Sequence, residues 1–236
     1  MTNFDDVKDE IEGEIVGVNR YNPNNIDKLE ACITLMVKEN KYDKDVLLTT
    51  LKLYQFNPDR YKESYVCQIL LKTMMVFPRN DYALAKYLVD SDRVNESVEL
   101  RRIIEIGAML ESCDFSLFWR LLRNEYKPEP SDDKYRNIDV KRIIEPIIGF
   151  EDAVRIYACR TVSVTFQSID KVQLARLLGN ISDQLLASYA KAYKWELRQN
   201  AKGACDYFIQ NHEDKIKSRN IEEKLRFEQC VEVMKN

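Results

Sequence analysis

The side chains best suited to nucleophilic or metal chemistry in this chain are one histidine and six cysteines. The histidine, His212, lies in a polar run between Gln210 and Glu213. A catalytic triad or a histidine-based zinc site needs further partners beside such a residue. A cysteine nucleophile would need a base, and nothing in the sequence brings a cysteine to His212. We therefore interpret His212 as a surface residue.

The cysteines are widely spaced, and most of them lie in apolar segments that have the pattern of a helix. No C-x-x-C pair occurs, so a zinc or redox motif has no support in the sequence. Because a free cysteine behaves as a small apolar side chain, we predict reduced core residues. They are Cys32, Cys67, Cys113, Cys159, Cys205 and Cys230.

Phosphate and carboxylate chemistry are equally poorly represented. Neither G-x-G-x-x-G nor G-x-x-x-x-G-K-[ST], the glycine-rich loops that hold phosphate groups, occurs in the sequence. The carboxylate pairs Asp132-Asp133 and Glu222-Glu223 lie in charged stretches that are typical of solvated surface. The sequence therefore predicts no catalytic residue, no metal ligand, no cofactor and no small-molecule ligand, and we do not expect an enzyme.

Composition and charge point to a helical protein without a strong overall field. The 236 residues include 36 basic and 39 acidic side chains, which give a net charge of −3. Nucleic acid or an anionic membrane would therefore have to bind locally. Only six glycines and six prolines occur, which favours long helices. The acidic N-terminus lacks the apolar run of a signal peptide, and no stretch approaches the ~20 apolar residues of a membrane span, so we expect a cytoplasmic location.

The first two-thirds of the sequence predicts amphipathic helices joined by short turns. Asn22-Pro23 and Asn57-Pro58 are the start signals of a first and a third helix, and Asp43 is placed to cap the second helix between them. Apolar residues recur at helical spacing after each signal, and Pro78 ends the third of these helices. We expect further helices in the segments 84–89, 100–107, 115–122 and 143–148. Helices paired in series form a solenoid with long exposed surfaces.

A polar stretch from Asn124 to Ile138 interrupts this pattern, and we predict a surface loop there. After Gly149 the order of elements changes to a helix, a short strand near 165–169, two helices and two strands near 195–198 and 206–210. This is the order of a winged helix, which elaborates the helix-turn-helix. We therefore predict a mainly α fold, with a stack of helices followed by a winged helix.

Several segments, in the same order along nearly the whole chain, resemble the subunit k family of eukaryotic translation initiation factor 3. They are Arg20-Tyr21-Asn22-Pro23, Leu51-Lys52-Leu53-Tyr54-Gln55-Phe56-Asn57-Pro58, Gln68-Ile69-Leu70-Leu71-Lys72, Leu110-Glu111-Ser112-Cys113 with Phe118-Trp119, and Gly149-Phe150-Glu151-Asp152 with Val154-Arg155. The stretch from Tyr126 to Asp139 departs from this family, since it is longer and more polar than the resemblance implies.

The resemblance implies a PCI-like architecture, with a HEAT-like helical domain at 1–149, a winged helix at 150–219 and a helical tail at 220–236. It also implies a non-catalytic scaffolding subunit that pairs with subunit l in a factor that binds the small ribosomal subunit. Two alternatives stay open. One is an RNA-binding winged-helix module, and the other is a subunit of another PCI complex, the proteasome lid or the COP9 signalosome.

Two sets of side chains in the C-terminal third are candidates for contacts. Residues 150–236 contain 14 basic and 12 acidic side chains, and four of the basic ones fall at the end of the third helix and in the wing, where an RNA backbone is a plausible ligand. They are Lys191, Lys194, Arg198 and Lys202. An ordinary solvated face is the alternative, because no aromatic residues alternate with these charges.

The second set would bind a partner protein. The strand near Tyr207 to Ile209 is expected to offer unpaired backbone to another subunit's winged helix. The C-terminal helix would join a bundle of helices through its apolar positions, or it would instead fold back on its own domain. The candidate docking residues are Tyr207, Ile209, Ile221, Leu225 and Val231.

Overall fold

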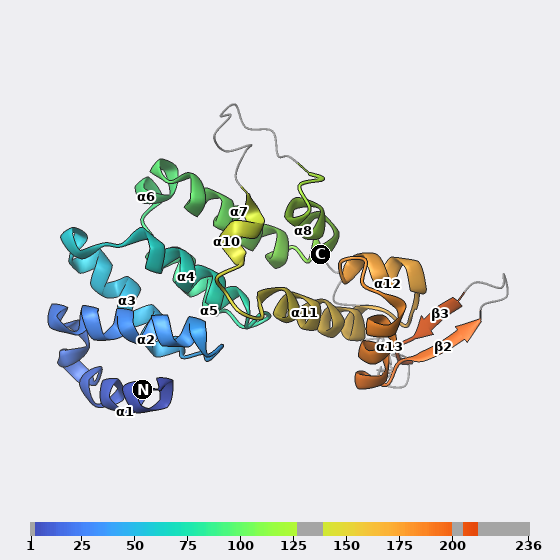
Figure 1. Ribbon diagram of the computed structural model, residues 1–236, viewed down its shortest axis with the longest axis horizontal. Coiled ribbons are helices and arrows are strands. Elements are labelled where there is room, and N and C mark those ends of the chain that lie inside the picture. The colour runs from blue at the N-terminus through green and yellow to red at the C-terminus, as the bar shows by residue number, and fades with distance from the viewer. Residues whose placement is uncertain (1–2, 127–138, 200–204, 212–236) are drawn as a thin grey trace, which may run out of the picture.

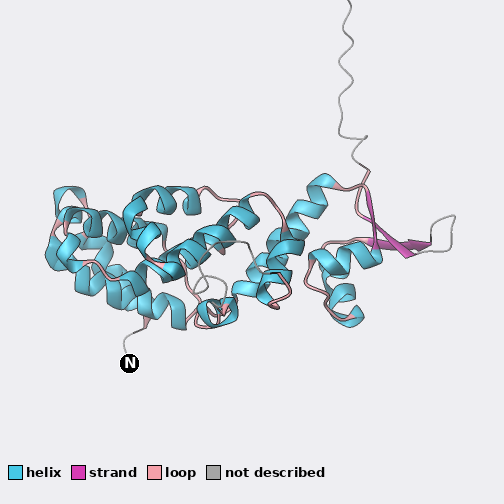
Figure 2. Cartoon of the chain, turned by 90° about the horizontal axis from the view of Figure 1, so that it is seen from above, coloured by secondary structure: helices cyan, strands magenta, loops and turns pink. Residues whose placement is uncertain are grey.

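The computed structural model describes residues 3–126, 139–199 and 205–211. It is elongated, with the helices of the first two-thirds stacked at one end and a small sheet at the other (Figures 1 and 2). The fold is mainly α, as predicted. Residues 127–138 of the loop predicted at 124–138, residues 200–204 and everything after Asn211 lie outside the described residues, so the tail at 220–236 and His212 are among them.

Nine described α-helices precede the winged-helix segment, and three short 3-10 turns accompany them. The first helices are α1 (Phe4–Glu14), α2 (Ile26–Lys38), α3 (Lys44–Phe56), α4 (Glu63–Met74) and α5 (Asp81–Leu88). The others are α6 (Ser91–Glu96), α7 (Val98–Glu111), α8 (Phe115–Leu122) and α10 (Val140–Ile144). The 3-10 turns are Gly17–Tyr21, Pro23–Asn25 and Pro58–Arg60.

The start signals in the sequence act on these helices in different ways. The Asp43 side chain accepts a hydrogen bond from the Val46 amide and caps α3, as predicted. The prediction that Asn57-Pro58 begins a helix is wrong by several residues. Pro58 opens only a 3-10 turn, and α4 starts at Glu63 because the backbone of Tyr61 and Lys62 is extended.

Helices α2, α3, α4 and α5 pack against one another and hold the centre of the core. The apolar stripe that predicts α2 is buried at Leu29, Cys32, Ile33 and Met36. Two helices were not predicted. α1 is rich in acidic residues and buries only Phe4 and Ile11, and α6 buries none of its residues. α6 therefore leaves no apolar stripe in the sequence, and the short stripe of α1 at Phe4, Val7 and Ile11 is set among acidic residues.

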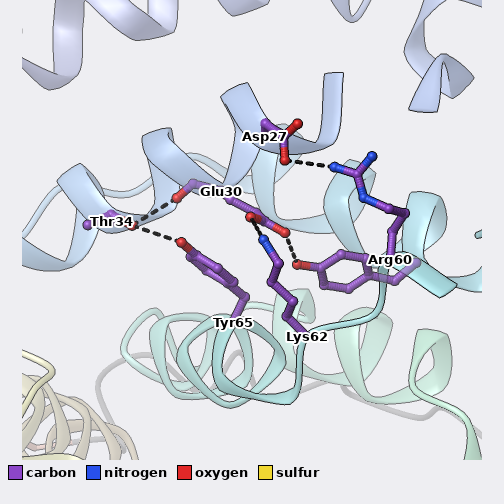
Figure 3. A network of polar contacts seen from close by, with 7 residues as sticks. Asp27, Glu30, Thr34, Arg60, Lys62 and Tyr65 are labelled. Carbon is purple, nitrogen blue, oxygen red and sulfur yellow. Dashed lines mark hydrogen bonds and ion pairs between the residues drawn. The ribbon is translucent and has the colours of Figure 1, made fainter. Parts of the chain in front are cut away.

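A buried carboxylate ties α2 to the segment that leads into α4 (Figure 3). Glu30 is 4% exposed, and it accepts hydrogen bonds from the Tyr54 hydroxyl at 2.8 Å and from the Lys62 ammonium group at 2.5 Å. Nearby, Arg60 pairs with Asp27 at 2.7 Å. Because a buried charge is costly unless it is paired, this network fixes the segment against α2.

The last third has the element order that the sequence predicts for a winged helix. Helix α11 (Phe150–Thr165) is followed by β1 (Ser168–Asp170), α12 (Lys171–Leu177), α13 (Asp183–Ala192), β2 (Glu196–Gln199) and β3 (Cys205–Phe208). The strands form one antiparallel sheet in the order β1-β3-β2, so Tyr207 lies between Ile169 and Leu197. The domain limits at 149 and 219 stay predictions, although α11 does begin directly after Gly149.

Trp119 of α8 joins the stack to this module. It is 3% exposed, and its indole N–H donates to the carbonyl of Leu177 at the end of α12. The Arg155 guanidinium lies 4.8 Å from the Trp119 ring and donates to the carbonyl of Leu178. One aromatic residue thus contacts both α11 and the turn after α12.

Candidate interaction surfaces

The predicted basic set lies at the far end of the winged-helix module. Lys191 is in the last turn of α13, Lys194 is in the turn that follows, and Arg198 is on β2. All three are exposed. Lys202 lies outside the described residues. Three of the four candidates therefore follow one another along the chain from the end of α13 to β2, and solvent reaches all three.

Arg198 already has contacts within the module. Its guanidinium pairs with Glu196 at 2.7 Å and lies 3.7 Å from the centre of the Phe208 ring. An arginine that stacks on an aromatic ring keeps its charge and has less rotamer freedom. The set thus consists of two exposed lysines and an arginine that is held on the sheet beside an acidic neighbour.

The expectation of unpaired backbone near Tyr207 and Ile209 is wrong. β3 is the central strand, with β1 on one side and β2 on the other. The amide of Ile209 donates to the carbonyl of Gln167. Tyr207 is 4% exposed and Ile209 is 8% exposed, so both side chains belong to the core of the module. The other docking candidates, Ile221, Leu225 and Val231, lie outside the described residues.

The edge strands of the described sheet are instead β1 and β2, and β2 is the more exposed of the two. All four of its residues are exposed, and Leu197 is 56% exposed. Further apolar side chains of the module also face solvent, at Val164 on α11, Val172 on α12 and Leu185 on α13. Sequence reasoning missed these residues. In the sequence they can be recognised as apolar residues that lie next to the buried stripe of a helix but outside it, as Leu185 lies next to Leu186.

The buried thiols do not have the electrostatics of a catalytic cysteine. Burial raises the pKa of Cys32 to about 11 and that of Cys159 to about 12. A nucleophilic cysteine needs the opposite shift, because the thiolate is the reactive form. These two residues are therefore protonated near neutral pH and act as core side chains, as predicted. The described cysteines are free thiols, and none of the described helices has the length and apolar character to span a membrane.

The sequence matches the model of the CSN8/PSMD8/EIF3K family over residues 60–220. It is 55% identical to eukaryotic translation initiation factor 3 subunit K of Brugia malayi, over 97% of this chain and 96% of that protein. The subunit K proteins of Caenorhabditis elegans and Homo sapiens are 48% and 35% identical, over 98% and 99% of this chain and 95% and 98% of theirs. These similarities cover both the helical stack and the winged-helix module, and the chain therefore belongs to the CSN8/PSMD8/EIF3K family, among the K subunits of eukaryotic translation initiation factor 3.

Proposed function

We propose that this chain is a non-catalytic scaffolding subunit of translation initiation factor 3, which supports assembly of the initiation complex on the small ribosomal subunit through protein contacts. The observation that carries the proposal is near full-length similarity to proteins named as subunit K of that factor. The alternative complexes, the proteasome lid and the COP9 signalosome, have less support, because these relatives carry the initiation factor's name.

The outer edge of β2 is the docking surface that we propose for a partner subunit such as subunit l. An exposed edge strand offers backbone donors and acceptors to a strand from another chain, and an apolar side chain on that edge adds buried area. Leu197 supplies such a side chain at the end of the molecule that is farthest from α1 (Figure 1). This surface replaces the one that was predicted around Tyr207.

The test is co-purification of the tagged full-length chain with the other subunits. We expect Leu197→Asp to reduce recovery of the factor about tenfold or more, because a charge at the edge opposes apolar burial. The matched control is Phe56→Asp, which changes an apolar side chain that is 65% exposed at the end of α3. Unchanged recovery with Leu197→Asp, or equal losses for the two variants, would contradict docking at β2. Recovery of lid or signalosome subunits instead would contradict the assignment to the initiation factor.

RNA contact is a second candidate function, favoured by the three exposed basic residues at the end of the winged-helix module. Binding of a ribosomal RNA fragment by the full-length chain would be measured at several salt concentrations. If Lys191, Lys194 and Arg198 contact phosphates, replacing all three with alanine reduces the slope of log affinity against log salt by about 2. Alanines at Lys28, Lys41 and Arg79 in the helical stack are the control. An unchanged slope in the first variant would exclude the phosphate contacts.

A further inference from the structure

Three side chains that carry metal-binding atoms meet where α4 packs against α7. Glu63 and Cys67 are four residues apart on α4, so they lie on the same face of that helix. Glu99 lies in the first turn of α7. The Cys67 sulfur and one carboxylate oxygen from each glutamate all lie within 4.8 Å of one another.

The group is built as a partly buried site with access from solvent. Cys67 is 8% exposed, whereas both glutamates are exposed. Cys67 and Glu99 also line a cavity of about 460 Å³ between α4, α7 and the segment around α10. Gln68 lines the same cavity, and its side-chain oxygen is buried without a hydrogen-bond partner among the described residues. A buried acceptor of this kind indicates that water or an ion belongs in the cavity.

The charges near the group also favour a cation. Among the described residues, no lysine or arginine forms an ion pair with Glu63 or Glu99, and Arg142 is the basic residue that lines the same cavity. Glu63 accepts a hydrogen bond from the Ser97 hydroxyl. Two carboxylates and a thiol thus converge with little positive charge between them. Burial and the two carboxylates together raise the pKa of Cys67 to about 12.

We propose that Glu63, Cys67 and Glu99 bind a zinc ion, with water as the fourth ligand. A thiolate selects zinc over magnesium or calcium, and three protein ligands plus water are a common zinc set. A tetrahedral site needs donor atoms ~3.5 Å apart, which the flexible glutamate side chains reach from their present positions. Binding replaces the thiol proton with the metal, so one proton is released for each zinc bound. This site departs from the prediction of no metal ligand, which considered C-x-x-C pairs, the histidine and carboxylates adjacent in sequence, but not residues brought together by helix packing.

The experiment uses the full-length chain, stripped of metal with a chelator and titrated with Zn²⁺ or with Co²⁺ as a spectroscopic probe. We expect about one equivalent of Co²⁺ to bind, with the visible bands of a tetrahedral site and a thiolate charge-transfer band in the near ultraviolet. Cys67→Ala removes that charge-transfer band. The control is Cys159→Ala, a buried cysteine whose pKa is raised by burial alone, and it leaves the spectrum unchanged.

Unlike Cys67→Ala, a second variant tests the site without changing a buried side chain. Glu99→Gln changes an exposed side chain with little change in volume, and we expect it to weaken Zn²⁺ binding about tenfold or more. Calorimetry in two buffers of different ionisation enthalpy measures the released proton. A cobalt spectrum without the thiolate band, a band that survives in Cys67→Ala, or zinc affinity unchanged by Glu99→Gln would each overturn the site. These outcomes are independent of co-purification with the initiation factor.

Discussion

The helical stack and the winged-helix module bury their apolar side chains in different ways. In the stack, α2, α3, α4 and α5 share one core, and many of its side chains are fully inaccessible. The module has a smaller core, and it leaves Val164, Val172, Leu185 and Leu197 largely exposed. The stack therefore has the larger core, although it too exposes apolar side chains such as Val18 and Tyr87, whereas the small core of the module is extended by its packing on Trp119 of α8.

Helix α11 shows how the two regions depend on each other. Tyr157 stacks on Phe77 with ring centres 5.3 Å apart and meets Phe115 edge to face at 5.2 Å. Phe118 lies 6.3 Å from Phe150 at the start of the same helix. The first half of α11 thus packs on the stack, and its end leads into the sheet.

Trp119→Ala is expected to destabilise the protein most, by about 3–5 kcal/mol, since it removes a large side chain at the contact between the regions. Urea unfolding followed by circular dichroism measures the loss. We also expect the transition to separate into two, one for each region. Phe56→Ala, which truncates a side chain that is 65% exposed, should change stability by less than about 0.5 kcal/mol. Comparable losses in the two variants would contradict the role assigned to Trp119.

Lys72→Met tests the core of the stack and is expected to stabilise it. Lys72 is 2% exposed, donates to the Asn40 side-chain oxygen at 3.2 Å, and has a pKa that burial lowers to about 8. Its pKa in the unfolded chain is ~10.4. Between these values the unfolded chain binds more protons, so this lysine makes folding stability rise with pH from about 8 to about 10.4.

Methionine removes this dependence. The variant should be more stable than the native chain by about 3 kcal/mol at pH 7, and the gain should shrink toward pH 10. The quantity to measure is the difference in unfolding free energy between the two chains at each pH, because the titration of other buried groups cancels in it. If this difference stays constant between pH 7 and pH 10, then burial does not lower the pKa of Lys72 in the folded chain.

Gly179→Ala perturbs the same contact as Trp119→Ala by a smaller amount. Gly179 has φ +93°, and an added Cβ would lie 2.8 Å from the Trp119 ring. We expect a loss of about 1–3 kcal/mol in the unfolding free energy. Gly13→Ala in α1 is the matched control, because an added Cβ there meets no atom within 4 Å, and it should gain about 0.5–1 kcal/mol. A neutral Gly179→Ala would mean that the module shifts freely on α8.

Tyr82→Phe carries the smallest expected effect. The Tyr82 side chain is fully buried, and its hydroxyl has no hydrogen-bond partner among the described residues. Removing that hydroxyl should therefore stabilise the stack by about 1 kcal/mol in thermal or urea unfolding. Tyr54→Phe is the opposite case, since that hydroxyl donates to Glu30, and it should cost about 2 kcal/mol. A loss in both variants would point to a partner for the Tyr82 hydroxyl.

Local signals in the sequence predicted much of the fold. The stripe on α2, the Asp43 cap and the element order after Gly149 all follow from residues within a few positions of one another. The start of α4 could not be placed, because Asn57-Pro58 fits a 3-10 turn as well as a helix. Helix α6 escaped prediction because it buries none of its residues.

The surfaces were harder to predict, since they depend on contacts between distant segments. The sequence indicates a strand at Tyr207, but whether it lies at the centre or the edge of the sheet depends on its pairing with Ile169. Likewise, Glu63 and Cys67 show helical spacing in the sequence, but Glu99 joins them only through the packing of α7 on α4. The exposure of Lys191 and Lys194 agrees with their place at the end of α13 and in the turn that follows it.

The order of the strands in the sheet also has a consequence for protein synthesis. β3 occupies the middle of the sheet, although it is the last of the three described strands in the chain. Many helices of the stack pack against helices that are close in sequence, and such local contacts form early in folding. The sheet cannot close until residues 205–208 have emerged. A nascent chain halted just before them carries two strands without their shared partner, and unpaired strand edges of this kind favour aggregation.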